Sequence, residues 1–293
     1  MHPEATEVAY TGIDEDCDPA TSDDDCEFGP HGSCFAYATA DESILYFDLR
    51  TGEILDTIVV PNAAEEGARS EPRDLAQTDD GRIAVFNGTF EPYLSVYDPA
   101  TTEWTHVTAP DWALTNMVYA GGLATYDHFV FVVNHSIITA EAAVIRFDLD
   151  GGEPTWFAVG RTDIQDVSVG LDGLLYVQDD LGEVQIYDLE TLEFQRELSI
   201  DLATGEAGVV ADADGNIYGV SWSNFAVKVA PDGTELARLD FDGVVNTFDL
   251  DLRANGSILI GERKGTILQT DTSFATPRPL SIASTSVFVA YAR

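Results

Sequence analysis

The fold of this chain is decided by one stretch, DVSVGLDGLLYVQDDLGEVQIYD, at residues 166–188. Its apolar residues alternate with polar ones in short runs, which is the two-residue period of half-buried β-strands. The pair Asp172-Gly173 separates the first two runs, and such dipeptides favour hairpin turns because both of their central residues can take positive φ. The last run ends in an aromatic residue followed by Asp, Tyr187-Asp188. The stretch therefore predicts consecutive antiparallel strands joined by tight turns.

The same two markers recur along the chain and define an internal repeat. Strand exits of the aromatic-Asp type, two of them degenerate, follow one another at a nearly regular spacing. Four antiparallel strands in about 40–50 residues make one blade of a β-propeller, and the spacing of the exits matches that length. The exits fall at Asp48, Asp98, Asp148, Asp188, Pro231 and Asp271, and the turns at Asp80-Gly81, Asp172-Gly173, Asp214-Gly215 and Asn255-Gly256.

Counting the repeats gives six units, and the first lacks an inner strand. Residues 35–38 lead directly to the first exit, whereas residues 286–291 form an apolar strand without a unit of its own. We therefore expect an all-β, six-bladed β-propeller over residues 35–293, in which the C-terminal strand completes the first blade. Closure of this kind removes the open sheet edge, which is an aggregation hazard. The alternative that the pattern leaves open is a pair of packed sheets, as in a β-sandwich.

The blade pattern resembles that of the six-bladed NHL and lactonase-like propellers and, more loosely, that of the YVTN and virginiamycin-lyase-like ones. Residues 166–177 and 184–188 carry the resemblance best. It implies a fold and no particular function, because one fold hosts many functions.

The net charge of the chain limits the kinds of partner that it can bind. Its 293 residues include 52 Asp+Glu against 14 Lys+Arg, for a net charge of -38. Contact with phosphates needs a basic face, so this balance argues against a nucleic-acid partner. The sequence has no run of about 18 apolar residues, so we expect no membrane span. High negative charge favours cations as partners and is also typical of a salt-adapted, solvated surface.

All three cysteines lie within the N-terminal segment 1–34, at Cys17, Cys26 and Cys34. Cysteines clustered in a small acidic segment indicate local disulfides and hence an exported chain, placed in the periplasm, at the cell surface or outside the cell. The odd count leaves one thiol over, and the sequence leaves the pairing open. The residues after Met1 lack the features of a signal peptide, so we expect a start truncated from a larger exported protein.

The acidic segment 1–34 contains a candidate calcium site. Three of its aspartates stand at alternate positions, and carboxylates at this spacing in an irregular loop suit one hard cation. A disulfide between Cys17 and Cys26 would fold a second acidic patch onto the first. The alternative is a solvated acidic linker without an ordered metal. The candidate ligands are Asp14, Asp16, Asp18, Asp23 and Asp25.

Residues 2–18 resemble the metal-binding-motif repeat of secreted bacterial surface proteins, the MopE-type repeat, which usually ends in D-G-I-D-N-D-C-D-G. This chain has T-G-I-D-E-D-C-D-P, so Thr11 and Pro19 depart from that pattern. The resemblance implies metal binding and raises copper as a second candidate. Copper prefers His or Cys ligands. His106 reads as a partly exposed strand residue beside Trp104, and His128 and His135 flank one strand at its opposite ends, so we assign no copper site.

Polar residues recur at the start of each inner strand, where the central channel of a propeller is lined. A ring of carboxylates and amides around one axis suits a cation or a small polar ligand. The lactonase-like resemblance implies a central calcium, and the alternative is polar filling of a wet channel. The candidate ligand-binding residues are Glu71, Arg73, Asp74, Asn116, Asp166, Glu206 and Asn246, with Thr115, Gln165, Asp249 and Thr285 at matching positions.

Nucleophilic catalysis finds no support, because the sequence has no G-x-S-x-G elbow and the propeller region has no Cys. We therefore expect an exported or cell-surface binding module with a calcium-stabilised N-terminal segment, either monomeric or part of a longer chain. Its partner would be an unidentified protein, glycan or small molecule. One alternative is a metal-dependent lactonase- or lyase-like enzyme with a divalent cation in the central channel, and another is a copper-binding surface protein.

Overall fold

The structure is a computed structural model in which most of the chain after residue 33 is described. It shows strands and turns, and none of the described residues belongs to a helix that could cross a membrane. The described residues are 34–61, 71–87, 93–107, 119–135, 142–161, 164–200, 202, 207–221, 225–241, 247–262, 265–275, 277–281 and 288–292.

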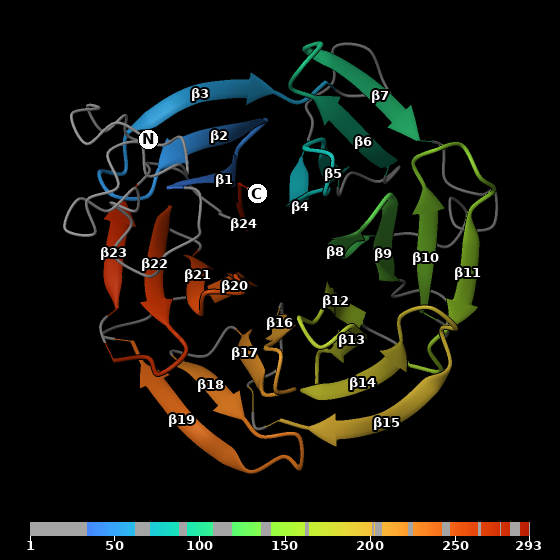
Figure 1. Ribbon diagram of the computed structural model, residues 1–293, viewed down its shortest axis with the longest axis vertical. Helices are drawn as coiled ribbons and strands as arrows, with labels where there is room; N and C mark the ends of the chain where they lie inside the picture. Colours follow the sequence, from blue (N-terminus) through green and yellow to red (C-terminus); the bar gives the residue numbers. More distant parts are fainter. Residues whose placement is uncertain are drawn as a thin grey trace, which may run out of the picture.

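The described strands form six sheets of four antiparallel strands, arranged in a ring about one axis (Figure 1). This confirms the six-bladed β-propeller and removes the sandwich alternative. Blade 1 holds β24, β1 (Phe35–Ala40), β2 (Ser43–Asp48) and β3 (Ile54–Val59). Blade 2 holds β4 (Pro72–Gln77), β5 (Ile83–Asn87), β6 (Tyr93–Asp98) and β7 (Glu103–Val107). Blade 3 holds β8 (Tyr119–Tyr126), β9 (Phe129–His135), β10 (Ala143–Asp148) and β11 (Thr155–Ala158).

The second half of the ring repeats this order from the inner to the outer strand. Blade 4 holds β12 (Ile164–Val169), β13 (Leu174–Asp179), β14 (Glu183–Asp188) and β15 (Phe194–Ser199). Blade 5 holds β16 (Ala207–Ala211), β17 (Ile217–Ser221), β18 (Phe225–Val229) and β19 (Glu235–Asp240). Blade 6 holds β20 (Thr247–Leu252), β21 (Ser257–Glu262), β22 (Thr266–Asp271) and β23 (Arg278–Ser281), and β24 is Val289–Tyr291.

The C-terminal strand closes the ring as the sequence predicted. β24 is the inner strand of blade 1 and pairs with β1, so that Ala36 faces Tyr291 and Ala38 faces Val289. Figure 1 shows β24 on the inner side of β1, toward the axis of the ring. The first blade is thus built from both ends of the propeller region.

The Asp at each strand exit has a local structural role. The Asp48 carboxylate accepts the backbone N–H of Arg50 at 2.7 Å, and the Asp98 carboxylate accepts that of Ala100 at 2.8 Å. Asp148, Asp188 and Asp271 accept in the same way from the backbone two residues on. A side chain that bonds the backbone two residues later makes an Asx turn. The repeat marker is therefore the signature of the turn that leads to the outer strand.

The Asp-Gly turns differ in one respect from the sequence expectation. Only the glycines take positive φ, with 78° at Gly173, 74° at Gly215 and 86° at Gly256, and the preceding Asp or Asn does not. The N–H of Gly173 donates to the carbonyl of Gly170 at 3.0 Å. This is the four-residue turn in which one Gly in the left-handed region forms the bulge, so a single positive φ suffices.

The core consists of six apolar clusters, one between each pair of adjacent blades. Between blades 4 and 5, for example, Tyr176 and Ile186 pack with Val209 and Val227. Outer strands bury little, and β15 and β19 alternate exposed with half-buried residues. The inner strands are therefore held from both sides, which fixes the positions of the residues at the axis.

Candidate functional site

A chamber of about 60 Å³ lies at the axis, between the inner strands of the blades. Among the described residues, its lining contains several carboxylates and no Lys, Arg or His. The acidic lining residues are Asp74, Asp166, Asp249 and Asp251.

Three of these aspartates form a repeated hydrogen-bond pattern. Asp74, Asp166 and Asp249 occupy equivalent positions near the starts of β4, β12 and β20, the inner strands of blades 2, 4 and 6. One oxygen of each accepts the backbone N–H of the next residue, at 2.7, 2.8 and 2.7 Å. The other oxygen accepts a backbone N–H from the inner strand of the following blade: Leu123 at 2.5 Å, Val209 at 2.7 Å and Val289 at 2.8 Å.

Each of these aspartates follows a bulge in its strand. The pairing register shifts between Pro72 and Asp74 in β4. It shifts at the same place before Asp166 in β12 and before Asp249 in β20. A bulge re-aims the side chain beside it. The bulges thus explain how residues within regular strands reach the neighbouring blade.

Glycines in the alternate blades allow this close approach. A Cβ on Gly122 of β8 would lie 1.8 Å from the Asp166 carboxylate and 2.6 Å from the Val167 nitrogen. A Cβ on Gly208 of β16 would lie 2.9 Å from the Cα of Asp249. Real Cβ atoms do not approach so closely, so only Gly fits at these two positions. The inner strands of blades 2, 4 and 6 therefore carry the aspartates, and those of blades 3 and 5, which lie between them, carry the glycines.

The chamber strongly favours protonated carboxyl groups. Burial raises the pKa of Asp74 and Asp166 well above its usual value, and that of Asp249 to about 7. The negative charge of Asp249 raises the pKa of Asp74 and Asp166 further. The backbone N–H donors act in the opposite direction, because they stabilise the carboxylate. Two like charges close together in a buried site cannot both ionise freely.

Two of the predicted channel ligands, Asp74 and Asp166, line the chamber together with Asp249. Glu71 and Arg73 do not line it, and their side chains form an ion pair at 3.8 Å. The side chain of Gln165, beside the bulge, is also outside the lining. The predicted ligands that fall outside the described residues are Asn116, Glu206 and Asn246, together with Thr115 and Thr285.

The predicted calcium ligands Asp14, Asp16, Asp18, Asp23 and Asp25 also lie outside the described residues, so calcium and copper binding there stay predictions. Cys34 is buried at the start of the described chain. Its candidate partners, Cys17 and Cys26, lie outside that part, and the pairing stays a prediction.

Two residues at the closure of the ring, Asp251 and Arg253, were not singled out from the sequence. Asp251 accepts the backbone N–H of Tyr291 at 2.8 Å, which repeats the bond from Val289 to Asp249. Arg253 donates to the carbonyl of Ala292 at 2.6 Å, and its guanidinium lies 3.9 Å from the centre of the Tyr291 ring. The alternating acids of FDLDLR, residues 248–253, were the visible signal.

A second group with metal-ligand chemistry lies in blade 3. Ligand atoms of His128, Asp148 and Asp150 all lie within 4.8 Å of one another. They meet because Phe129 pairs with Asp148 across β9 and β10. His128 already contacts Asp127 at 2.8 Å, and Asp150 lies 3.9 Å from the guanidinium of Arg82. The sequence analysis singled out no such group, because His128 precedes β9 and Asp148 ends β10, and only the pairing of these strands brings them together.

No protein-family model matches this chain, and no curated protein matches its sequence. Solved structures match its fold. A protein of unknown function from Bacteroides caccae superposes with a TM-score of 0.62 at 13% identity, covering 88% of this chain and 98% of that one. A chain of the mitotic checkpoint complex superposes with a TM-score of 0.58 at 12% identity, covering 85% and 74%. These likenesses support the six-bladed propeller, whereas the MopE-type and NHL or lactonase-like identities stay predictions.

Proposed function

We propose that this protein is a non-catalytic binding module, exported or at the cell surface, that recognises an extended segment of another protein along the edge of blade 1. The single observation that carries the proposal is the exposed apolar edge strand β3. Val59 is 65% exposed, Leu55 46% and Ile54 42%. Exposed edge strands are templates for an added strand, in which main-chain hydrogen bonds give affinity and alternate side chains give specificity.

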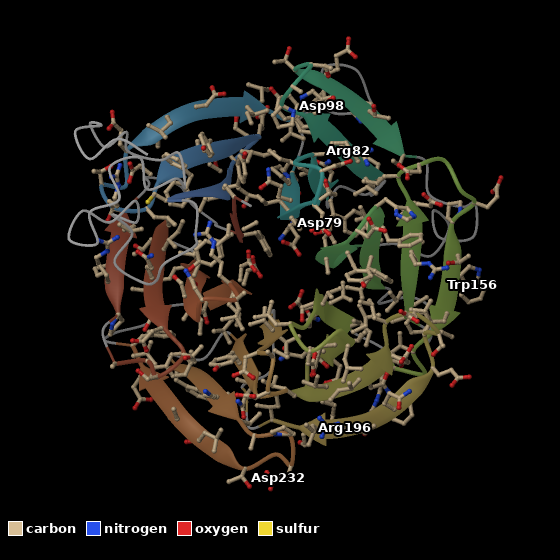
Figure 2. All side chains as sticks on the ribbon, viewed as in Figure 1. Asp79, Arg82, Asp98, Trp156, Arg196 and Asp232 are labelled. Carbon is tan, nitrogen blue, oxygen red and sulfur yellow. The ribbon has the colours of Figure 1, made fainter. Side chains whose placement is uncertain are left out.

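Other outer strands carry features that discourage strand addition. β15 presents Arg196 and Glu197, and β19 presents Glu235, Arg238 and Asp240. β23 contains Pro279, which cannot donate to a ladder. β11 has an exposed Trp156, which Figure 2 shows at the outer rim, but it is only four residues long. Charges and Pro are the usual protection of sheet edges, so β3 is the edge best suited to a partner.

Charge selects the kind of segment that fits β3. Residues 51–61 contain two acids, Glu53 and Asp56, and no basic residue. The net charge of -38 opposes pairing of this edge with a second copy of the chain. The proposed partner is therefore a different protein, with an apolar extended segment flanked by Lys or Arg.

The geometry of the chamber supports binding over catalysis. Both oxygens of Asp74, Asp166 and Asp249 already accept backbone N–H groups. No three of the described chamber carboxylates bring their oxygens within 4.8 Å of one another. A catalytic metal needs several protein ligands and an open position for substrate. The lactonase- or lyase-like alternative therefore has less support than the binding module.

A peptide selection tests the proposal. A phage-displayed library of extended peptides would be panned against the full chain, and the enriched peptides measured on wild type and on the double variant Leu55→Lys, Val59→Lys. Charged side chains on an edge strand, Lys above all, discourage strand addition. We expect peptides with alternating apolar residues and basic flanks, and at least about tenfold weaker binding to the variant.

The matched control is Leu236→Lys, because Leu236 is 52% exposed on the outer strand β19 of blade 5. It should bind the selected peptides like wild type, and hydrogen exchange should show peptide-dependent protection at residues 54–59. The proposal is wrong if the peptides bind the β3 variant unchanged, or if the protected amides lie elsewhere.

A further inference from the structure

The first turn of blade 3 departs from the repeat. In blades 4 and 6 the residue directly before the second strand is a glycine with positive φ, Gly173 or Gly256. Blade 3 has His128 at this place, and the positive φ lies one residue earlier, with 53° at Asp127. Asp adopts this conformation more readily than most residues. A residue without a side chain is thus replaced by one with a metal-binding ring.

The pairing of β9 with β10 places His128 beside the next turn of the blade. The N–H of Leu149 donates to the carbonyl of His128 at 3.0 Å. The Asp148 carboxylate accepts the N–H of Asp150 at 2.8 Å, so this Asx turn keeps the second carboxylate near the first. Nε2 of His128 lies 3.8 Å from Oδ1 of Asp148. Tetrahedral ligands at 2.0–2.2 Å from one ion stand about 3.3–3.6 Å apart, so the present spacing is close to that of a metal site.

The imidazole of His128 is oriented for metal binding. Its Nδ1 lies 2.8 Å from a carboxylate oxygen of Asp127. A carboxylate only accepts hydrogen bonds, so Nδ1 carries the proton and Nε2 carries the lone pair. Nε2 has no hydrogen-bond partner among the described residues. Histidines that bind metals usually donate their other N–H to a carboxylate in this way. Asp127 therefore leaves available the nitrogen that faces Asp148.

Blade 1 shows which charge belongs beside such an aspartate. Asp48 and Asp148 end the third strand of their blades, so Arg50 and Asp150 occupy equivalent places two residues later. The Arg50 guanidinium bonds the Asp48 carboxylate, with Nε 3.1 Å from Oδ1. Blade 3 has a second carboxylate where blade 1 has this cation. Arg82 of blade 2 lies 3.9 Å from Asp150, but it has a closer carboxylate partner in its own blade.

We propose that His128, Asp148 and Asp150 bind one Zn²⁺ ion at the turns of blade 3, with water at the remaining position. One imidazole nitrogen and two carboxylate oxygens suit zinc, whereas Ca²⁺ and Mg²⁺ prefer oxygen alone. Asp127 acts as a positioning residue. The ion takes the electrostatic role that Arg50 has in blade 1. None of the three ligands lines the axial chamber or belongs to β3, so this site does not depend on the proposed function.

A zinc titration of the full chain tests the proposal. The protein would be stripped with a chelator, exchanged into excess CaCl₂ to fill oxygen-only sites, and titrated with ZnCl₂ at about pH 7.5, where imidazole is mostly neutral. Calorimetry should give one equivalent bound. The ¹⁵N resonance of His128 Nε2 should shift in long-range ¹H–¹⁵N spectra, with the assignment taken from His128→Phe. That variant keeps a ring against Phe129 but loses the ligand, so it should lose the zinc affinity.

Three further variants locate the ion. Asp150→Asn removes a charged ligand from an exposed turn and should weaken zinc binding at least about tenfold. The matched control is Glu190→Gln, because Glu190 stands two residues after Asp188 in blade 4, as Asp150 does after Asp148. It should bind zinc like wild type. Asp127→Asn keeps a residue that tolerates positive φ and should weaken binding about tenfold, because the imidazole loses its charged partner.

Any of four results would overturn the proposal. The first is no saturable zinc binding by the full chain, and the second is displacement of the zinc by excess MgCl₂. The third is equal affinity in Asp150→Asn and Glu190→Gln, which stays informative if His128→Phe fails to fold, since Asp150 is exposed. The fourth is loss of the bound zinc when Asp14, Asp16 and Asp18 are changed to Asn, which would place the ion in the N-terminal segment.

Discussion

Single residues set how closely adjacent blades approach one another. Gly122 and Gly208 are needed because the neighbouring aspartate strand occupies the space that a Cβ would take. Asp166 of blade 4 contacts the blades on both of its sides. It lies against Gly122 of blade 3, and its carboxylate accepts the backbone N–H of Val209 of blade 5. At the interfaces of blades 3 and 4 and of blades 5 and 6, the aspartate strand therefore fits only because the facing residue is Gly.

We expect Gly122→Ala to destabilise the protein by about 3 kcal/mol or more, because the new methyl group collides with a carboxylate and with backbone. The melting temperature should fall by roughly 6–12 °C in a calorimetric scan. Gly219→Ala is the control, since its Cβ would meet only the end of the Leu202 side chain, at 3.0 Å. Similar melting temperatures for the two variants would show that β8 can move away from β12.

The closing strand is the element with the least pairing of its own. β24 has three residues, and its attachment to blade 6 relies on Asp249, Asp251 and Arg253. Arg253 also donates to the carbonyl of Phe35 at 3.2 Å, so it joins β20 to both ends of the propeller region. The seam is thus held by side chains from the last complete blade.

Arg253→Ala should lower stability by about 2 kcal/mol, because it removes two hydrogen bonds to carbonyls and the contact with the Tyr291 ring. Hydrogen exchange should speed up in β24 and β1 more than in blades 3 and 4. Arg238→Ala is the control: Arg238 also lies over an aromatic ring, that of Phe225 at 4.0 Å, but it lies away from the seam and its other partner is a surface ion pair with Glu235, which contributes little. If hydrogen exchange became faster to the same extent in all six blades, Arg253 would not act locally at the closure of the ring.

The whole molecule combines an acidic axis with a strongly acidic overall charge. Six interblade clusters supply the apolar burial, and the ring shape places three carboxylates of separate blades around one chamber. Protonation of these carboxylates relieves their mutual repulsion. The solution conditions should therefore influence stability more than in a propeller with an apolar axis.

The protein should lose stability as the pH rises from 6.5 to 8.5. The folded pKa of Asp249 is about 7 and those of Asp74 and Asp166 are also raised above 3.8, so the folded chain binds more protons than the unfolded chain in this range. This stabilisation is complete below about pH 4 and is lost as the pH passes the folded values. Asp251 and Tyr291 are the other titratable groups of the lining.

Melting temperatures in the presence of a chelator check this trend. The range starts at pH 6.5 because His106, whose pKa burial lowers, acts in the opposite direction below that value. Asp249→Asn should flatten the dependence. A melting temperature that is constant or rises over this range would contradict the raised pKa values.

Salt should stabilise the molecule, because the net charge of -38 makes it repel itself. The screening length falls from about 10 Å at 0.1 M to about 3 Å at 1 M, so KCl at 1 M should raise the melting temperature. Sucrose at equal osmolality is the control for solvent exclusion. A rise with sucrose as large as that with KCl would show that screening is not the cause.

The sequence by itself determined the elements, their order and the closure of the ring. These follow from local chemistry: Asx turns at Asp48 and Asp188, one left-handed Gly at each Asp-Gly turn, and the period of two in the strands. An unpaired strand at each end of the repeat region left one economical solution. Such features depend on neighbours along the chain, and they can be read without a structure.

Only the tertiary structure decided the site. Asp74, Asp166 and Asp249 stand two blades apart along the chain, and polar residues at similar places, such as Glu71 and Arg73, lie outside the chamber. The sequence did contain a pattern that marks this site: every second inner strand begins with an Asp followed by Leu or Val. The inner strands between them carry Gly122 and Gly208. A bulge decides which side chain faces the axis, and ring closure decides what it meets. Both depend on pairing between distant strands.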